Sequence, residues 1–288
     1  MSAHRIPSPT KLERSITPAG DAITGYLAAD QRTRRTMARA ARASFARIRA
    51  GHGFTSPGSL LTSPDAQPKT GKSEVPTFTV MMTPARHSGL ANVCPAATSC
   101  ADVCLSTAGK GGMPVVQRSR LARTELLVSD PFAWGVLLAA ETVAALGRHG
   151  AIALRLNCLS DVRWELAIPD ALRALQAAGV TLYDYSKWSP RLRGRLEGYS
   201  ITYSAHERMT DADVVALTSA GLNVAMVFAV RRGQPLPATY LGVPVIDGDL
   251  SDYRPADPAG VVVGLRAKGA AIHDTSGFVR GIPMALAA

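Results

Sequence analysis

The chain is poor in cysteine, in aromatic residues and in long apolar runs, and each scarcity excludes a class of protein. Four cysteines among 288 residues, in a chain with no recognisable signal peptide, favour a reduced cytoplasm over a disulfide-bonded secreted domain. Aromatic residues make up only 6% of the chain, which leaves few rings for stacking bases. No apolar run approaches the ~20 residues of a membrane span, and Met1–Arg5 lacks the apolar core of a signal peptide. We therefore expect a cytoplasmic protein that does not contact a membrane.

Positive charge is concentrated near the N-terminus. Residues 1–75 carry twelve Lys and Arg against five Asp and Glu, a net charge of +7. Residues 76–288 carry twenty against seventeen, a net of +3. A basic segment of this kind either attracts a polyanion or makes the protein more soluble. The hydrophobic content of 47% and the mean hydropathy of +0.07 are those of an ordinary globular protein of one or two domains.

Residues 30–50 predict a basic helix. Asp30 is suited to cap its N-terminus and Gly51 to end it. Seven arginines spread around this helix and leave a thin apolar stripe; the arginines are Arg32, Arg34, Arg35, Arg39, Arg42, Arg47 and Arg49, and the stripe is Met37, Ala41, Phe45 and Ile48. The segment Arg32–Arg49 either binds nucleic acid or another acidic partner, or is a solvated surface helix.

The composition changes after this helix. Residues 51–74 are rich in Gly, Ser, Thr and Pro, a composition typical of a loop or linker. We place a domain boundary near Pro76, with a basic N-terminal helix and linker over residues 1–75 and an α/β domain over residues 76–288. On this division, residues 1–74 should be dispensable for folding of the remainder.

Residues 76–288 alternate between apolar strands and helical patterns. The predicted strands are Val75–Thr83, Ala151–Leu156, Val180–Tyr185, Tyr199–Tyr203, Asn223–Val230, Val243–Ile246 and Val261–Leu265. The predicted helices are Val115–Val128, 131–147, Pro169–Ala178 and Asp211–Ala220. This alternation indicates a mostly parallel sheet. The favoured fold class is α/β, a partial or complete parallel βα barrel preceded by a basic helical N-terminal extension; an open doubly wound sheet is the alternative.

Polar residues follow most of these strands. Because binding and catalytic groups of barrels and open α/β sheets gather at the carboxyl ends of the strands, we select five candidate catalytic residues there. They are Asp161, Asp184, Lys187, His206 and Asp249, with Asn157 as a candidate cofactor-binding residue. Each of them, taken alone, also suits a salt bridge or a loop hydrogen bond. As a set on one rim, they suit acid–base catalysis and binding.

Three of the four cysteines lie within eleven residues, at Cys94, Cys100 and Cys104. Cys100 and Cys104 are four residues apart, so on a helix both thiols would point from one face. Three converging thiolates suit a metal ion or an iron–sulfur cluster, whereas a disulfide or small buried thiols are the alternatives. Zinc would need a fourth protein ligand, for which Cys158 and His87 are candidates.

A glycine-rich turn follows the cysteines, over residues 105–114. Backbone amides at Gly109 and Gly111, with the amine of Lys110, would hold a phosphate or carboxylate. The spacing is not that of a P-loop, and a flexible connection is the alternative. Arg118, Arg120 and Arg123, in the helix that follows, line an anionic site or face water.

The runs CPAATSCADVCLSTAGKGG, RLNCLSDVRWE, YDYSKW and VPVIDGDLSDYRP resemble the gene-product-88-like family of actinobacterial phages and related plasmids. The resemblance covers about residues 76–288 and implies a phage or mobile-element context, hence the cytoplasm of the host cell. A looser resemblance is to radical S-adenosylmethionine enzymes. Their spacing is Cys-x3-Cys-x2-Cys, whereas five and three residues separate the cysteines here, and a clear glycine-rich strand for binding S-adenosylmethionine is missing.

These observations support two main functions. The first is a phage-type metal-centre protein, with an iron–sulfur cluster or alternatively zinc, that acts on an anionic or nucleic-acid-related substrate. The second is a non-enzymatic nucleic-acid-binding protein of phage replication or host takeover that holds a structural zinc. A nuclease with magnesium on Asp161, Asp184, Asp247 and Asp249 would join the two, and a purely structural role for zinc remains a third.

Overall fold

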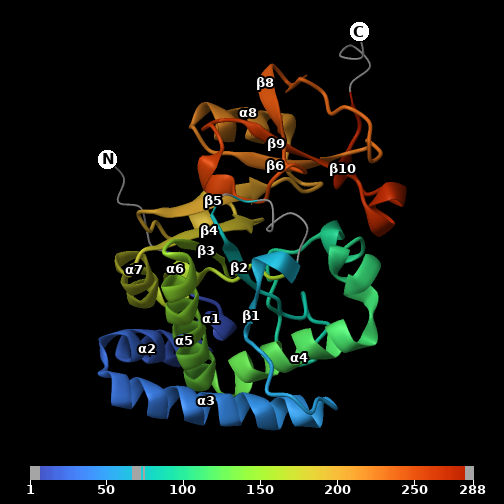
Figure 1. Cartoon of the computed structure of the whole chain (residues 1–288). Coiled ribbons are helices and arrows are strands. Elements are labelled where there is room, and N and C mark those ends of the chain that lie inside the picture. The colour runs from blue at the N-terminus through green and yellow to red at the C-terminus, as the bar shows by residue number, and fades with distance from the viewer. Residues whose placement is uncertain (1–6, 67–72, 74, 283–288) are drawn as a thin grey trace.

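The computed structural model describes residues 7–66, 73 and 75–282. Within them a single sheet of ten strands runs through the molecule, and helices pack against it (Figure 1). The strand order is β1-β2-β3-β4-β5-β6-β9-β8-β7, and β10 also pairs with β6. Seven of the nine strand pairings between described residues are parallel; the exceptions are β1 with β2 and β7 with β8. The predicted mostly parallel α/β sheet is therefore confirmed.

Apart from a helix through Cys100 and Cys104, the predicted strands and helices of residues 76–288 form, with ends shifted by a few residues. The strands are β1 (Leu61–Thr62), β2 (Thr77–Val80), β3 (Ile152–Arg155), β4 (Val180–Ser186), β5 (Tyr199–Ser204), β6 (Val224–Phe228), β7 (Thr239–Tyr240), β8 (Val243–Asp247), β9 (Val262–Arg266) and β10 (Val279–Arg280). The helices among the described residues are α1 (Lys11–Ser15), α2 (Thr17–Ala28), α3 (Gln31–Gly51), α4 (Pro114–Ser129), α5 (Pro131–His149), α6 (Trp164–Ala167), α7 (Pro169–Ala177) and α8 (Asp211–Ser219). Local hydrophobic periodicity and end residues were sufficient to find most of them.

The sheet of the described strands is open, so the partial or complete βα barrel that the sequence favoured is not confirmed. From β2 to β6 the spatial order follows the chain order, as it would in a barrel. After β6 the chain first forms the antiparallel pair β7–β8, and β9 then returns between β6 and β8. The short antiparallel strands β1 and β7 consequently occupy the two edges, and no pairing between described residues joins one edge to the other.

The N-terminal helices α2 and α3 pack on α5, which also contacts β3 of the sheet (Figure 1). Gly135 of α5 allows the closest approach, because a Cβ at this position would lie 2.3 Å from the carbonyl oxygen of Ala19 in α2. From α3, the buried Phe45 enters the same cluster, and the Trp134 and Trp164 rings stack with their centroids 5.2 Å apart. Buried contacts thus cross the division at residue 75, and the N-terminal helices share one core with β2, β3 and β4.

A buried ion pair adds a polar link between the N-terminal segment and the loop that follows β3. Glu13 of α1 is 1% exposed and accepts two hydrogen bonds from the Arg163 guanidinium, at 3.0 and 2.7 Å. The Arg163 guanidinium also lies over the ring of Trp188, with its central carbon 4.3 Å from the ring centroid. Because Arg163 is itself 3% exposed, removal of either partner would leave a buried charge unpaired.

The predicted linker over residues 51–74 contributes to the sheet in its described part. Leu60 and Leu61 are buried, and their backbone N–H groups donate to the Glu141 carboxylate at 3.0 and 2.8 Å. Leu61 then begins β1. Residues 67–72 and 74 of this predicted linker lie outside the described residues. Burial of the two leucines explains why a segment of loop-like composition forms an edge strand.

A second hydrophobic cluster lies at the other end of the sheet, where α8 covers β6 and β9. No single helix in the described ranges is long and apolar enough to cross a membrane. Only α4 and α5 taken together meet the length and composition, and they are bent by 119° where they join.

Candidate functional site

A cavity of about 480 Å³ opens at the carboxyl ends of the parallel strands. Its wall includes Arg155 from β3, Tyr185 from β4, Ser204 from β5 and Arg266 from β9, together with Asp249 from the loop after β8. The segment between β2 and α4 supplies much of the rest of the wall. This is the edge at which the sequence predicted a site.

All four cysteines line this cavity. Cys94, Cys100 and Cys104 come from the segment between β2 and α4, and Cys158 comes from the loop after β3. All four are free cysteines of intermediate exposure, and none is paired in a disulfide in this structure. The predicted helix through Cys100 and Cys104 is wrong: short 3-10 turns over Ser99–Ala101 and Leu105–Thr107 replace it. Cys100 and Cys104 therefore reach the same cavity wall without the four-residue helical spacing that the sequence suggested.

Cys94 has the best-defined surroundings of the four. Its Sγ accepts a hydrogen bond from the backbone N–H of Ala85 at 3.3 Å, and its thiol donates to the carbonyl oxygen of Leu159 at 3.3 Å. Ala85 has a φ of 49°, in the left-handed region that a residue with a Cβ rarely adopts. The pKa of Cys94 is raised to about 12, mainly by burial and to a smaller extent by the neighbouring Asp161, whereas the hydrogen bond from Ala85 opposes the rise. This thiol therefore stays protonated at neutral pH unless a cation binds it.

Cysteine is a ligand that soft metals prefer, but these cysteines are not positioned closely enough to form a coordination sphere. In the part of the chain that the structure describes, no group of three or more His, Cys, Asp and Glu side chains is positioned to hold a metal ion. The donor set itself, four thiols facing one space with His87 also in the wall, is the kind that zinc and iron–sulfur clusters use. Metal binding would require the 3-10 turns to draw the sulfurs closer together.

Two carboxylates on the far wall are paired with cations. Asp252 accepts from a guanidinium nitrogen of Arg155 and from the Tyr185 hydroxyl, the latter at 3.3 Å. Asp249 accepts from the Nζ of Lys268 at 2.6 Å and from the guanidinium of Arg266 at 3.2 Å. These pairs hold the loop after β8 against β3 and β9.

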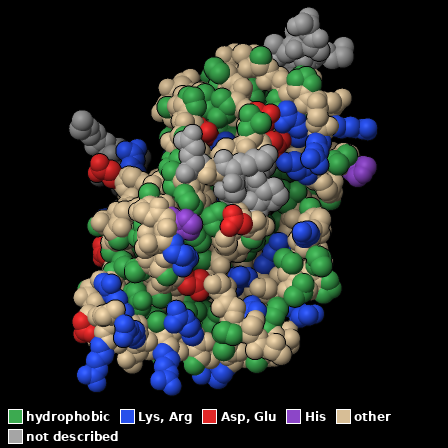
Figure 2. All heavy atoms as spheres, in the orientation of Figure 1, with side chains coloured by type: hydrophobic (Ala, Val, Ile, Leu, Met, Phe, Trp, Pro, Cys, Tyr) green, Lys and Arg blue, Asp and Glu red, His purple; other side chains and the backbone are tan. Residues whose placement is uncertain are grey.

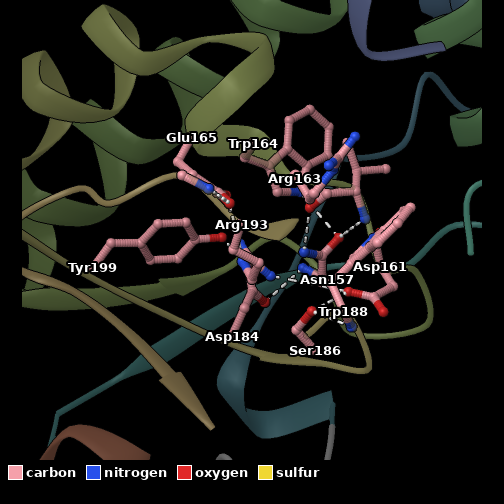
Figure 3. Close-up of polar contacts among 12 residues, drawn as sticks. Asn157, Asp161, Arg163, Trp164, Glu165, Asp184, Ser186, Trp188, Arg193 and Tyr199 are labelled. Atoms are coloured by element: carbon pink, nitrogen blue, oxygen red, sulfur yellow. Dashed lines mark hydrogen bonds and ion pairs between the residues drawn. The ribbon is translucent and has the colours of Figure 1, made fainter. Parts of the chain in front are cut away.

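Asn157 and Asp184 organise the loop after β3 (Figure 3). The Asn157 side-chain oxygen accepts from Ser160, from the backbone N–H of Val162 and from the Trp164 indole, at 2.9, 3.0 and 3.0 Å. Its amide nitrogen donates to the Val162 carbonyl at 2.8 Å. Although Asn157 reaches the cavity wall, both ends of its amide group form hydrogen bonds within the loop, and these bonds hold the loop in place.

Asp184 lies behind the cavity and not on its wall. It is completely buried, accepting from the Asn157 backbone N–H at 2.7 Å and from the Tyr199 hydroxyl at 2.6 Å (Figure 3). Burial raises its pKa to about 7. The group therefore supports the loop that carries Asn157 and Cys158 and has no direct access to a ligand.

Asp161 joins this network to the cavity (Figure 3). It lines the wall, is 6% exposed, and accepts from the Ser186 hydroxyl and the Lys187 backbone N–H, both at 2.8 Å. Burial raises its pKa. Arg193 lies nearby, with one of its nitrogens 4.0 Å from Asp161 and a buried ion pair to Glu165. Of the five candidate catalytic residues, Asp161, Lys187 and Asp249 thus share the cavity wall.

Several other predicted residues lie away from the cavity. His206 is not on its wall; the ring Nδ1 accepts from the backbone N–H of Arg208 at 3.2 Å, and burial lowers the pKa of the ring. Gly109, Lys110 and Gly111 form a short 3-10 helix, also outside the wall, with the side chain of Lys110 exposed. The glycine-rich turn instead turns backbone carbonyls toward α4, where Gly111 accepts from Gln117 and Arg120.

Three residues of the cavity wall were not identified from the sequence. Asp252 and Arg155 were not among the predicted site residues, and Arg120 was not distinguished from Arg118 and Arg123 on the same helix. Arg120 reaches the cavity wall and is 5% exposed, whereas Arg118 on the same helix is exposed to solvent. Asp252 follows a strand in the run VPVIDGDLSDYRP, so it meets the same strand-end criterion as Asp249. Nothing local distinguishes Arg120, because its burial depends on the turn that folds over it.

Fold and cavity together define an α/β protein with an open, mostly parallel sheet and a cysteine-lined cavity at the carboxyl ends of its strands. The chain belongs to the Gene product 88 family, whose model matches residues 58–281. This match confirms the resemblance to the phage family and begins just before β1. No curated protein and no solved structure matches the chain. Nothing in these comparisons supports the looser resemblance to radical S-adenosylmethionine enzymes.

Proposed function

We propose that this chain is a metal-centre protein that binds an iron–sulfur cluster, with zinc as the alternative, through Cys94, Cys100 and Cys104. The cavity would present this centre to an anionic or nucleic-acid-related substrate. The observation that carries the proposal is that all four cysteines of the chain, from two separate segments, line one cavity at the carboxyl edge of the sheet.

Three further observations support a cluster. The fourth thiol, Cys158, lines the same cavity and would supply the ligand that a three-cysteine centre lacks. The Ala85 N–H already donates to Cys94 Sγ, and hydrogen bonds to cluster sulfurs are one of the means by which proteins set cluster potentials. Arg120, Arg155 and Lys187 would offset the negative charge of a thiolate-bound cluster. In this proposal the protein works in the host-cell cytoplasm, where thiols stay reduced.

The cavity also offers groups that would bind and protonate a substrate. Asp161 and Lys187 stand beside each other on the wall, and the carboxyl pKa of Asp161 is raised by burial. A raised pKa suits a carboxyl group to proton transfer near neutral pH. Asp249 and Lys268 form an ion pair on the opposite side of the same space. Asp184 and Asn157 would act by positioning the loop that carries Cys158.

Anaerobic purification followed by iron, zinc and sulfide analysis and a visible spectrum tests the proposal. We expect iron and sulfide in stoichiometric amounts and charge-transfer absorption that Cys100→Ser and Cys104→Ser abolish, with folded protein remaining by circular dichroism. Thr107→Ala is the matched control, because it alters the same segment without removing a thiol. Stoichiometric zinc without sulfide would select the zinc alternative. Protein that takes up neither metal after anaerobic reconstitution would overturn the proposal.

A second candidate function, nucleic-acid binding, is favoured by the outer face of α3. Arg32, Arg35, Arg39, Arg42 and Arg47 are exposed there, while Arg34 and Arg49 turn inward. Lys and Arg side chains line the lower edge of the molecule in Figure 2, where Figure 1 places α3. A row of exposed arginines at helical spacing suits the phosphate backbone, without sequence readout.

A further inference from the structure

The cavity carries more positive than negative charge. Five cationic side chains line it, namely Arg120, Arg155, Lys187, Arg266 and Lys268, against three carboxylates, Asp161, Asp249 and Asp252. Two positive charges are therefore in excess on the wall. In a space shielded from water, such an excess favours an anionic ligand.

The pairing of these groups identifies the two cations in excess. Arg155 pairs with Asp252, Lys268 pairs with Asp249, and Arg266 pairs with both Asp249 and Asp247. The Asp161 carboxylate accepts hydrogen bonds from Ser186 and from the backbone of Lys187, and it lies 4.0 Å from a nitrogen of Arg193. Arg120 and the amine of Lys187 are left without an ion pair to any described carboxylate. The Lys187 amine lies 5.4 Å from the centre of the Phe278 ring.

Arg120 is held rigidly and yet only partly satisfied. One terminal nitrogen donates to the carbonyls of Ser106 and Gly111, at 2.6 and 3.2 Å. Gln117 donates to the same two carbonyls, at 2.8 and 2.6 Å, and so fixes the turn that holds the guanidinium. The Nε of Arg120 is buried with no hydrogen-bond partner among the described residues.

The glycine at position 111 makes this arrangement feasible. A Cβ there would lie 2.9 Å from the Ser106 carbonyl oxygen and 3.2 Å from a terminal nitrogen of Arg120. The glycine-rich turn is thus built to close over an arginine. A buried cation with an unsatisfied donor is costly, and an anionic ligand would offset that cost.

No carboxylate among the described residues pairs with the Arg120 guanidinium, although it is buried and reaches the cavity wall. A negative charge beside it would therefore come from a molecule that enters the cavity.

We propose that Arg120, assisted by Lys187, binds an oxyanion group, a phosphate or a carboxylate, of the molecule that enters the cavity. A planar guanidinium with available donors suits either group. The inference deepens the proposed function by naming the charged group of the substrate, but it requires no metal and can be tested on the metal-free chain.

Isothermal titration calorimetry of the metal-free full chain with inorganic phosphate, pyrophosphate and citrate provides the test. We expect saturable binding of at least one probe near one equivalent. Arg120→Met should weaken it roughly ten- to hundredfold, the range for loss of a charged hydrogen bond, and Lys187→Met should weaken it less. Arg118→Met is the matched control, because it removes the same charge from the exposed face of the same helix. Its binding should stay within about twofold of wild type.

The probes separate the two sources of the oxyanion: phosphate or pyrophosphate binding indicates a phosphoryl group, and binding of citrate alone a carboxylate. Absence of saturable binding for all three, or equal binding by a folded Arg120→Met variant, refutes the proposal. If Arg120→Met does not fold, Arg120→Lys and Lys187→Met decide in its place, and unchanged affinity in both refutes it. Protein that binds an anion but never takes up metal would refute only the metal centre. Protein that takes up metal but binds none of the three anions would refute only the anion site.

Discussion

Buried acids around the cavity keep their protons to unusually high pH. Asp184 has the clearest case, because burial raises its pKa from an ordinary 3.8 to about 7. A carboxyl group with a higher pKa in the folded than in the unfolded state contributes stability fully below pH 3.8. That contribution is lost as the pH rises toward 7, since the unfolded chain ionises first. Burial also raises the pKa of Asp161, so the contribution of this group to stability likewise falls as the pH rises.

Asp184→Asn should remove this loss, because the amide stays neutral and keeps an oxygen to accept from the Asn157 N–H. We expect the stability of the variant relative to wild type to increase between about pH 4.5 and 7.5. Since one pKa unit corresponds to about 1.4 kcal/mol, the change should be on the order of a few kcal/mol. Urea denaturation at several pH values measures it. A difference between variant and wild type that is constant over this range would show that Asp184 is ionised in the folded protein.

The helix α3 divides its arginines between two tasks. Arg34 donates to the carbonyls of Tyr26 and Leu27 and so ties α3 to the end of α2. Arg35, Arg39 and Arg42 are exposed and make no such hydrogen bonds within the described structure. Arginines occur all around this helix in the sequence. Because one face of α3 packs on α5, only the arginines on the outer face remain exposed and available to a partner.

Replacing Arg35, Arg39 and Arg42 together by Ala should weaken binding to single- or double-stranded DNA. The slope of log affinity against log salt should fall by about three units, close to one for each phosphate that the variant no longer neutralises. Fluorescence anisotropy across a salt series measures it. Arg34→Ala is the control: it should leave the slope unchanged and lower the stability by about 1–3 kcal/mol. An unchanged slope in the triple variant would assign any affinity for DNA to another surface.

At the scale of the whole molecule, the N-terminal helices share one hydrophobic core with β2, β3 and β4. Ile16, Ala19 and Ile23 of the N-terminal region are fully buried together with Trp134 of α5 and Leu154 of β3. The composition of residues 51–74 led to the expectation that residues 1–74 are dispensable. The buried contacts favour the opposite outcome, since their removal would expose one side of α5 to water.

Phe45→Ala should therefore lower the stability of the whole protein by about 3–5 kcal/mol, the usual cost of a large buried side chain. Arg42→Ala, one turn away and exposed, should change it by no more than about 0.5 kcal/mol. Deletion of residues 1–57 should give an insoluble chain or one without a cooperative melt, as differential scanning calorimetry would reveal. A soluble fragment of residues 76–288 with the melting temperature of the full chain would instead establish two independent domains.

Local sequence patterns were enough to specify the elements and the fold class. Apolar runs, end residues and prolines are local features, so β4, α7 and α8 could be placed within a residue or two. Asp30 was predicted to cap α3, and its carboxylate does accept from the Thr33 N–H at 2.9 Å. Positions after strands also brought Asp161, Lys187 and Asp249 to one edge, because parallel strands end on the same side of a sheet.

How these elements close around the cavity depends instead on tertiary contacts. The sheet stays open because β9 inserts between β6 and β8, a choice that depends on contacts far apart in sequence. His206 and Asp184 follow or end strands as their neighbours do, yet packing turns them away from the cavity. Arg120 is buried, unlike Arg118 of the same helix, because a turn of 3-10 helix folds over it. Burial, ion pairing and pKa depend on which segments pack together in space, and in this chain those segments are often far apart in sequence.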